Sequence, residues 1–146
     1  NFLEQIADTG EKVLLILDDV VADIRGKGKG EIENKLEKIF FNRRHLCGAG
    51  GSCSVIATSQ TYNKISPKLR KSASQFILFE NRQKAEQKSI FQEIILIPEK
   101  EYFDVMKYVY NKKHNFMYID TTRSQDDMIH KNFNKLVIDS PNIMKF

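Results

Sequence analysis

Apolar residues along the chain fall into short continuous runs and helical spacings, separated by polar segments. The first run, Val13 to Leu17, has no polar break and ends at Asp18 and Asp19. A continuous Val/Ile/Leu run of this length is typical of a strand buried on both faces, as in the middle of a parallel sheet. Cys53 to Ser59 forms a second short buried strand, followed at once by Gln60. The pattern therefore predicts two neighbouring strands that each end at polar side chains.

An amphipathic helix is predicted between these two strands. Glu31 to Asn42 places Ile32, Leu36, Ile39 and Phe40 on one face. Such a helix supplies the crossover that connects parallel strands.

The rest of the chain continues the alternation of strands and helices. After a predicted loop at Thr61 to Leu69, the patterns predict strands at Ala73 to Phe79, Phe116 to Asp120 and Asn134 to Asp139, and helices at Arg82 to Ile95 and Pro98 to Tyr110. We therefore expect an α/β fold with a mainly parallel sheet flanked by helices.

Composition and net charge limit the fold and the functions that the chain can have. With 146 residues, the chain is one domain or part of one, and 23 basic against 19 acidic residues give a net charge of +4. This charge is compatible with nucleic-acid contact without requiring it. No apolar run approaches the ~18 residues of a membrane span. His45, Cys47 and Cys53 match no zinc spacing and lack a fourth ligand, so two free cysteines in a reducing, intracellular setting are expected instead.

Asp18 and Asp19 lie where open α/β sheets bind ligands, beyond the carboxyl end of a strand. In nucleotide hydrolases this pattern is the Walker B motif, in which the first acid holds Mg²⁺ and a second orients the attacking water. An acidic turn is the alternative. Gln60, at the end of the neighbouring strand, could bond the water or the γ-phosphate, or it could simply open a loop.

A glycine-rich loop, Arg25 to Gly30, follows the acids. It lacks the Lys-Ser/Thr of a phosphate-binding loop and does not directly follow its strand. We interpret it as a surface linker, with contact to a nucleic-acid backbone through Lys27 and Lys29 as the alternative.

Several short motifs together resemble a known family. They are LLILDD, NRRH, TSQTYNKI, the group Pro67, Arg70, Lys71 and Ala73 before FILF, and the late segments NFMYID and HKNFNKLVID. Their order is similar to that of the poxvirus-type genome-packaging ATPases of large DNA viruses and virophages, which belong to the FtsK/HerA class of DNA pumps. The resemblance runs from about Lys12 to Ile138. It implies a P-loop NTPase core of which residues 1–146 are the C-terminal portion, with the Walker A loop upstream.

The resemblance also implies roles for individual residues. Asp18 would be the Mg²⁺-linked acid, Asp19 the water-activating acid and Gln60 the polar sensor. Of the adjacent Arg43 and Arg44, the second matches better an arginine that acts on the ATP of a neighbouring subunit. Arg70 also matches a recurrent arginine, which could contact phosphate, DNA or a neighbouring subunit.

The activity implied by the resemblance is Mg-ATP hydrolysis by a ring-forming motor that moves double-stranded DNA into a viral capsid. The partners would be DNA, further copies of the chain and the capsid or portal vertex, in the virion or at an intracellular assembly site. Residues 1–146 alone would not hydrolyse ATP. Another DNA translocase or helicase of the same class, and a non-enzymatic α/β binding module, remain the alternatives.

Overall fold

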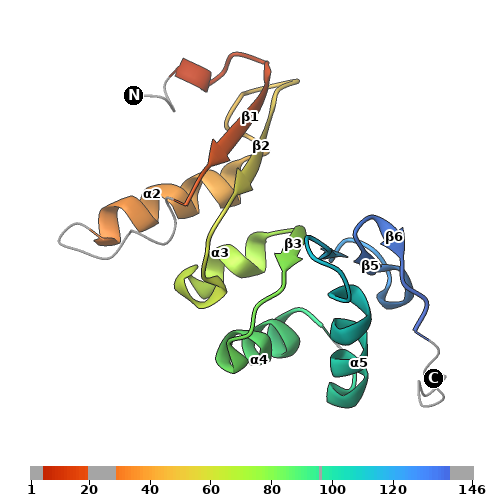
Figure 1. The fold of residues 1–146 in the computed structure, drawn as a ribbon. Coiled ribbons are helices and arrows are strands. Elements are labelled where there is room, and N and C mark those ends of the chain that lie inside the picture. Colours follow the sequence, from red (N-terminus) through yellow and green to blue (C-terminus); the bar gives the residue numbers. More distant parts are fainter. Residues whose placement is uncertain (1–4, 20–28, 96, 139–146) are drawn as a thin grey trace. The chain divides into compact units, whose positions relative to one another are not determined.

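The computed structural model describes residues 5–19, 29–95 and 97–138 of the chain. The fold is mixed α/β and divides into two compact units, Asn1–Ser72 and Ala73–Phe146 (Figure 1). Each unit has its own sheet, and we describe the two units separately.

Unit 1 is built on a strand–helix–strand crossover. β1 (Lys12–Leu17) and β2 (Ser52–Ala57) pair in parallel, from Lys12 opposite Ser52 to Leu17 opposite Ala57. The helix α2 (Lys29–Asn42) connects them, as the sequence predicts, because parallel strands need a long crossover. A short 3₁₀ turn, η1 (Tyr62–Lys64), and the helix α3 (Pro67–Ser72) follow.

One face of the β1–β2 pair is packed. Val13, Leu15 and Val55 lie against a buried cluster of Ile6, Cys47 and Cys53. Gly51 allows the chain to pass close to this cluster, because a Cβ at that position would lie 2.6 Å from Cys47 Cβ.

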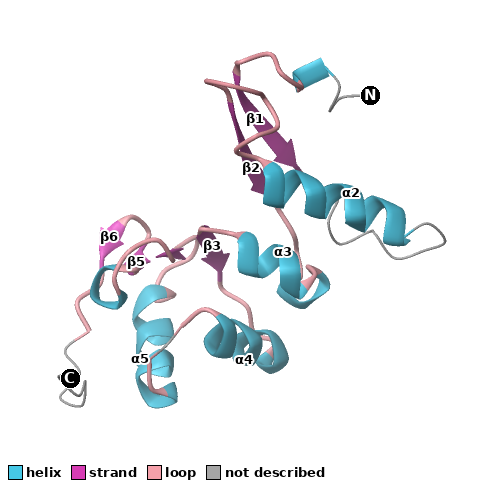
Figure 2. Ribbon diagram, turned by 180° about the vertical axis from the view of Figure 1, so that it is seen from behind, coloured by secondary structure: helices cyan, strands magenta, loops and turns pink. Residues whose placement is uncertain are grey.

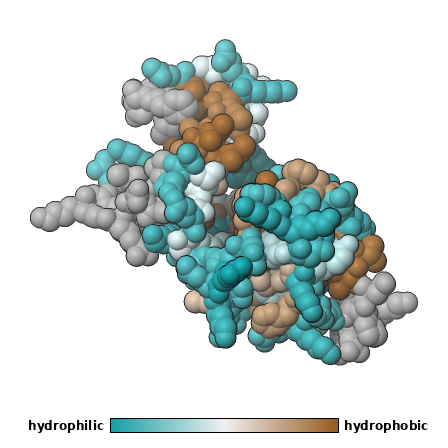
Figure 3. Space-filling model, viewed as in Figure 1, coloured by the Kyte–Doolittle hydropathy of each residue, from teal (hydrophilic) through white to brown (hydrophobic). Residues whose placement is uncertain are grey.

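The other face of the pair carries exposed apolar side chains, Leu14, Ile16 and Ile56, with exposed fractions of 55%, 61% and 51%. Ile16 pairs with Ile56, and apolar surface gathers over these strands (Figure 3). The expectation of a strand buried on both faces is therefore wrong for β1. Side chains alternate across a strand, and the buried cluster covers a single face.

Unit 2 contains a four-stranded antiparallel sheet in the order β3-β4-β5-β6, of which β3, β5 and β6 are labelled in Figure 2. The elements of this unit, in chain order, are β3 (Gln75–Phe79), α4 (Lys84–Glu93), α5 (Glu99–Val109), β4 (Phe116–Asp120), the 3₁₀ turn η2 (Gln125–Asp127), β5 (Ile129–Lys131) and β6 (Asn134–Lys135). The expected mainly parallel sheet is therefore wrong. The short links around β5 can join only antiparallel neighbours, and the path through α4 and α5 returns β4 antiparallel to β3.

The helices pack on one face of this sheet. Met117 and Ile119 of β4 are 1% and 0% exposed, and Val109 at the end of α5 is fully buried. The hydroxyl of Tyr110, just beyond α5, donates a hydrogen bond to the carbonyl of Leu78 in β3, at 2.9 Å. Burial raises the pKa of the Tyr102 hydroxyl in α5 to about 12.

Three elements differ from the sequence prediction. Pro67, in the predicted loop, begins α3, since proline is tolerated in the first turn of a helix. β5 lies between the last two predicted strands, and its three residues are too few to give a periodic signal. The strand predicted at Asn134 to Asp139 is shorter than expected, because residues 136–138 follow β6 (Asn134–Lys135) without strand pairing.

A buried carboxylate stabilises the turn after β4. Asp120, 4% exposed, accepts hydrogen bonds from the Thr122 hydroxyl at 2.6 Å, the Thr122 amide at 3.0 Å and Arg123 Nε at 3.1 Å. These donors, the Thr122 hydroxyl foremost, lower the pKa of Asp120. A carboxylate with a lowered pKa contributes stability above its unfolded pKa of about 3.9. That contribution is lost as the pH falls through the folded pKa.

We expect Thr122→Val to lower the thermal unfolding midpoint at neutral pH, because it removes the hydroxyl that contributes most to the lowered pKa of Asp120. For the same reason, the midpoint of Thr122→Val should decrease less than that of wild type on acidification. Thr122→Ser keeps the hydroxyl and should behave as wild type. The measurement is the unfolding midpoint of each protein across the acidic range. Parallel pH profiles for wild type and Thr122→Val would contradict this account.

Candidate functional site

The candidate site lies where β1 and β2 end. Asp18 and Asp19 follow β1 directly, and Thr58 follows β2. The ladder continues one step past the strands, because the Thr58 amide donates to the Leu17 carbonyl at 2.9 Å. Both carboxyl ends therefore lie at the same edge of the pair, as parallel pairing requires.

A short hydrogen-bond network joins the two strand ends. The Thr58 hydroxyl donates to Asp18 Oδ1 at 2.6 Å and accepts the Asp19 amide at 2.9 Å. The side-chain amide of Gln60 donates to Asp19 Oδ2 at 2.8 Å. The structure thus brings Asp18, Asp19 and Gln60 together, the three residues expected to share one crevice.

The backbone of Asp19 has φ of +52°, in the left-handed region that non-glycine residues seldom adopt. Aspartate tolerates this conformation better than most residues do. The turn lets Asp19 direct its amide toward Thr58 and its carboxylate toward Gln60. Asp19 Oδ1 is buried and accepts no hydrogen bond from the part of the chain that the structure describes.

The donor set at this edge fits Mg²⁺. This ion is commonly held by one or two carboxylates and completes its shell with water and phosphate oxygens. Thr58 and Gln60 each bond one oxygen of an acid, and the buried Oδ1 of Asp19 is still an unused acceptor. Within residues 5–19, 29–95 and 97–138, no group of three or more His, Cys, Asp or Glu could enclose a metal by itself.

Thr58 is the residue of this network that sequence reasoning missed. Its hydroxyl contacts both acid residues. The available signal was its position, because a residue just after one parallel strand lies opposite the residue just after its neighbour. That signal becomes useful only when the register, Leu17 opposite Ala57, is known.

Arg43 and Arg44 lie at the opposite end of β2. The Cys53 amide, at the start of β2, donates to the Arg43 carbonyl at 3.0 Å. Arg43 Nη1 donates to the Phe40 carbonyl at 2.6 Å and closes the end of α2, whereas Arg44 is exposed. At about 3.3 Å per extended residue, Arg44 lies roughly 20 Å from Gln60, so it does not act on the acids of its own chain.

Arg70 packs inside unit 1. It is 9% exposed, and its guanidinium donates to the Tyr62 carbonyl and to Asn63 Oδ1 while lying 4.6 Å from the centre of the Tyr62 ring. These contacts fix α3 to the preceding 3₁₀ turn. The structure therefore gives this arginine an internal packing role, whether or not it also contacts a ligand.

The remaining candidates of the sequence are accounted for differently. Cys47 and Cys53 are free thiols, 0% and 4% exposed. Burial raises the pKa of Cys53, which disfavours the thiolate that binds metals. Lys27 lies outside the described residues, and Lys29 begins α2 with its side chain undescribed.

Comparison of the chain with protein-family models, curated proteins and solved structures gave no match. Among the helices that the structure describes, none has the length and apolar character needed to cross a membrane.

We expect Thr58→Val to loosen the candidate site, because valine keeps the shape of threonine but can neither donate to Asp18 nor accept from Asp19. Two partly exposed hydrogen bonds correspond to about 1 kcal/mol of unfolding free energy. Hydrogen exchange of the Asp19 amide should accelerate in Thr58→Val and stay slow in Thr58→Ser. An unchanged exchange rate in Thr58→Val would argue against the network.

Proposed function

We propose that the edge formed by Asp18, Asp19, Thr58 and Gln60 is the acidic half of an Mg-ATP hydrolysis site. The observation that carries the proposal is the hydrogen bond from Gln60 to Asp19 across the ends of two parallel strands. An acidic turn explains two adjacent aspartates, but it does not require an amide from a segment 41 residues away to bond one of them.

Each residue of the edge has a distinct chemical role in this proposal. Asp18 contributes a carboxylate oxygen to Mg²⁺, which when bound neutralises charge on the phosphates. Asp19 would orient the attacking water and accept its proton. Gln60 holds the other oxygen of Asp19 and so sets the orientation of the carboxylate. Thr58 positions both acids.

A complete site also requires groups that hold the phosphates. The family that the sequence resembles would supply them as a Walker A loop encoded upstream and an arginine from a neighbouring subunit. Arg44 is exposed at the start of β2, while the acids lie at its far end. A head-to-tail arrangement of subunits would bring one end against the other, and such interfaces form rings when the rotation between subunits closes.

The proposed work of this ATPase is the translocation of double-stranded DNA into a viral capsid. The order of the sequence motifs supports this part of the proposal. A ring that holds the phosphate backbone without reading bases fits a net charge of +4.

The two acids should have separable effects in a protein that also carries a phosphate-binding loop. Asp19→Asn should bind Mg-ATP with near-normal affinity and lose most of its turnover, since the proton acceptor is removed. Asp18→Asn should weaken the Mg²⁺-dependent part of ATP binding. Nucleotide binding with and without Mg²⁺, together with steady-state hydrolysis, measures both effects. Equal and mild effects would indicate a structural acidic turn.

The arginine is tested by mixing subunits. Arg44→Ala should keep ATP binding and lose about 10³–10⁵-fold in turnover, the effect of removing an arginine that stabilises the transferred phosphoryl group. Mixed with Asp19→Asn subunits, it should recover part of the activity, because each variant supplies what its neighbour lacks. Arg82→Ala, which removes another exposed arginine, is the control. If rings shown to be mixed do not recover activity, Arg44 has no role in a neighbouring site.

A further inference from the structure

The sheet of unit 2 presents aromatic rings on the face away from its helices. Ile77 pairs with Tyr118, and Phe79 pairs with Phe116, so these four side chains share one face. Phe133, in the turn between β5 and β6, joins them, with its ring centre 5.1 Å from that of Phe116 and 5.6 Å from that of Tyr118. We refer to Phe79, Phe116, Tyr118 and Phe133 as the aromatic strip.

The strip is not an ordinary solvent face. An antiparallel sheet with one face packed on helices normally carries polar residues on the other. Here Phe79 and Phe133 are 62% and 70% exposed, and Ile77 beside them is 52% exposed. The rings support one another by edge-to-face contacts, including 6.0 Å between the centres of Phe79 and Phe116. Exposed apolar clusters of this kind mark binding surfaces.

Lysines gather at the end of the sheet where Phe116 and Phe133 lie. Lys112 and Lys113 are exposed in the turn that leads into β4. Asn132 ties this end together, since its Oδ1 accepts the Phe116 amide at 3.0 Å and its Nδ2 lies 3.4 Å from Asn115 Oδ1.

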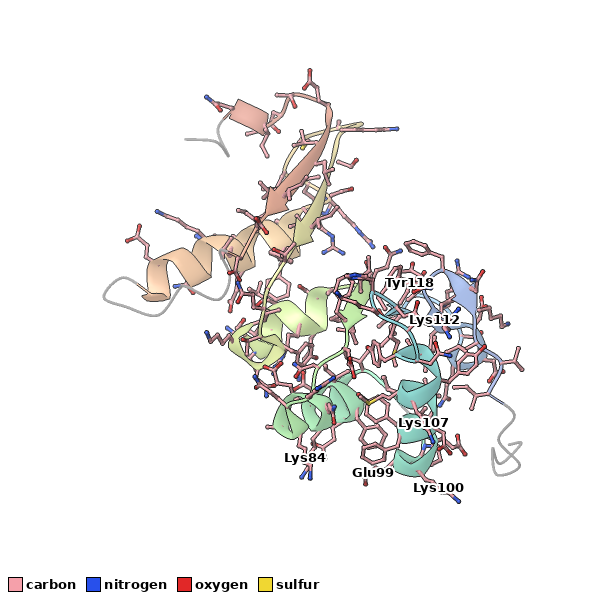
Figure 4. The ribbon with its side chains drawn as sticks, in the orientation of Figure 1. Lys84, Glu99, Lys100, Lys107, Lys112 and Tyr118 are labelled. Carbon is pink, nitrogen blue, oxygen red and sulfur yellow. The ribbon has the colours of Figure 1, made fainter. Side chains whose placement is uncertain are left out.

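Lys112 and Lys113 are the cations that an anionic partner could reach at this end. Lys131 pairs with Met117 and so points to the helix-facing side of the sheet, where its Nζ donates to the Tyr108 carbonyl at 3.0 Å and to Asn111 Oδ1 at 2.9 Å. Within the described ranges, no carboxylate pairs with Lys112 or Lys113. Lys112 lies beyond the end of α5, near the sheet, whereas Glu99 and Lys100 lie at the opposite end of that helix (Figure 4).

We propose that the aromatic strip binds single-stranded nucleic acid, with bases stacked on its rings and phosphates held by Lys112 and Lys113. Aromatic rings on a sheet, combined with nearby cations, are the chemistry by which proteins hold unpaired bases. Bases of a duplex are already stacked on one another and do not offer their faces. Lysine is depleted at protein–protein interfaces, so the flanking lysines favour nucleic acid over a protein partner.

The aromatic strip and the proposed ATP site are different surfaces. The strip lies in unit 2, while Asp18, Asp19 and Gln60 lie in unit 1. Binding at the strip needs neither ATP nor Mg²⁺. Its test on the 146-residue chain is therefore independent of the test of the hydrolysis site.

Fluorescence anisotropy with three labelled probes of about 12 nucleotides separates stacking from charge. They are oligothymidylate, an abasic strand of the same length, and a duplex. We expect oligothymidylate to bind more tightly than the abasic strand, which has the same backbone charge but no bases, and more tightly than the duplex.

Phe133→Leu and Phe79→Leu should each weaken oligothymidylate binding by about fivefold or more. They should leave abasic-strand binding unchanged, because leucine keeps an apolar side chain but removes the ring face. Phe103→Leu is the matched control, since Phe103 on α5 is 53% exposed and lies outside the strip. Circular dichroism of each variant checks that the fold is retained.

Lys112→Gln and Lys113→Gln should weaken oligothymidylate and the abasic strand alike. The slope of log affinity against log salt should fall by about 0.7 for each phosphate that the variant no longer neutralises. Lys84→Gln, on α4, is the control.

Three results would overturn the proposal. The first is equal affinity for oligothymidylate and the abasic strand, and the second is unchanged binding in both phenylalanine variants. The third is a chain that sediments as a dimer and becomes a monomer in Phe133→Leu, which would assign the strip to a second copy.

Discussion

Six residues of β1 pair in register with six of β2, and both strands run in the same direction. This parallel ladder determines the layout of unit 1. It requires the long crossover that α2 provides, and it brings the two carboxyl ends to one edge. A shift of β1 by one residue would turn Val13 and Leu15 away from the buried cysteines and would separate Thr58 from Asp18.

The edge of this ladder concentrates negative charge and holds it in place with neutral donors. A hydroxyl and an amide each bond one carboxylate, so both acids are oriented by uncharged groups. In the function that we propose, this arrangement would hold a cation and supply the proton acceptor. The left-handed backbone of Asp19 is the local strain that this arrangement accepts.

The sheet of unit 2 is antiparallel, and its role differs from that of the parallel ladder in unit 1. Short links join β4, β5 and β6, whereas β3 and β4 are connected through α4 and α5. The helix-facing side chains form a core around Met117 and Ile119. The outer face repeats large apolar residues where water would favour polar ones. The inner face therefore stabilises the fold, and the outer face is exposed to the partner that we infer for the aromatic strip.

The sequence by itself determined the local elements. Continuous apolar runs located β1, β2, β3 and β4, and helical spacing located α2, α4 and α5, because these signals depend on side chains near in the chain. The pairing of Asp18 and Asp19 with Gln60 followed from one further rule, that neighbouring parallel strands end together. The short β5 and the helix α3 carry too few residues for such a signal, and the run that predicted a strand at Asn134 to Asp139 located β6 but overestimated its length.

Only the tertiary structure decided three features. They are the strand direction in the second sheet, the exposed face of β1 and the two contacts of Thr58. Each depends on which segments far apart in the chain become neighbours. An apolar run is compatible with burial on one face or two, and with parallel or antiparallel partners. Hydrogen bonding between strands that are distant in the chain determined which faces are buried and which strand directions form. It also brought the Thr58 hydroxyl within 2.6 Å of the carboxylate of Asp18, 40 residues earlier.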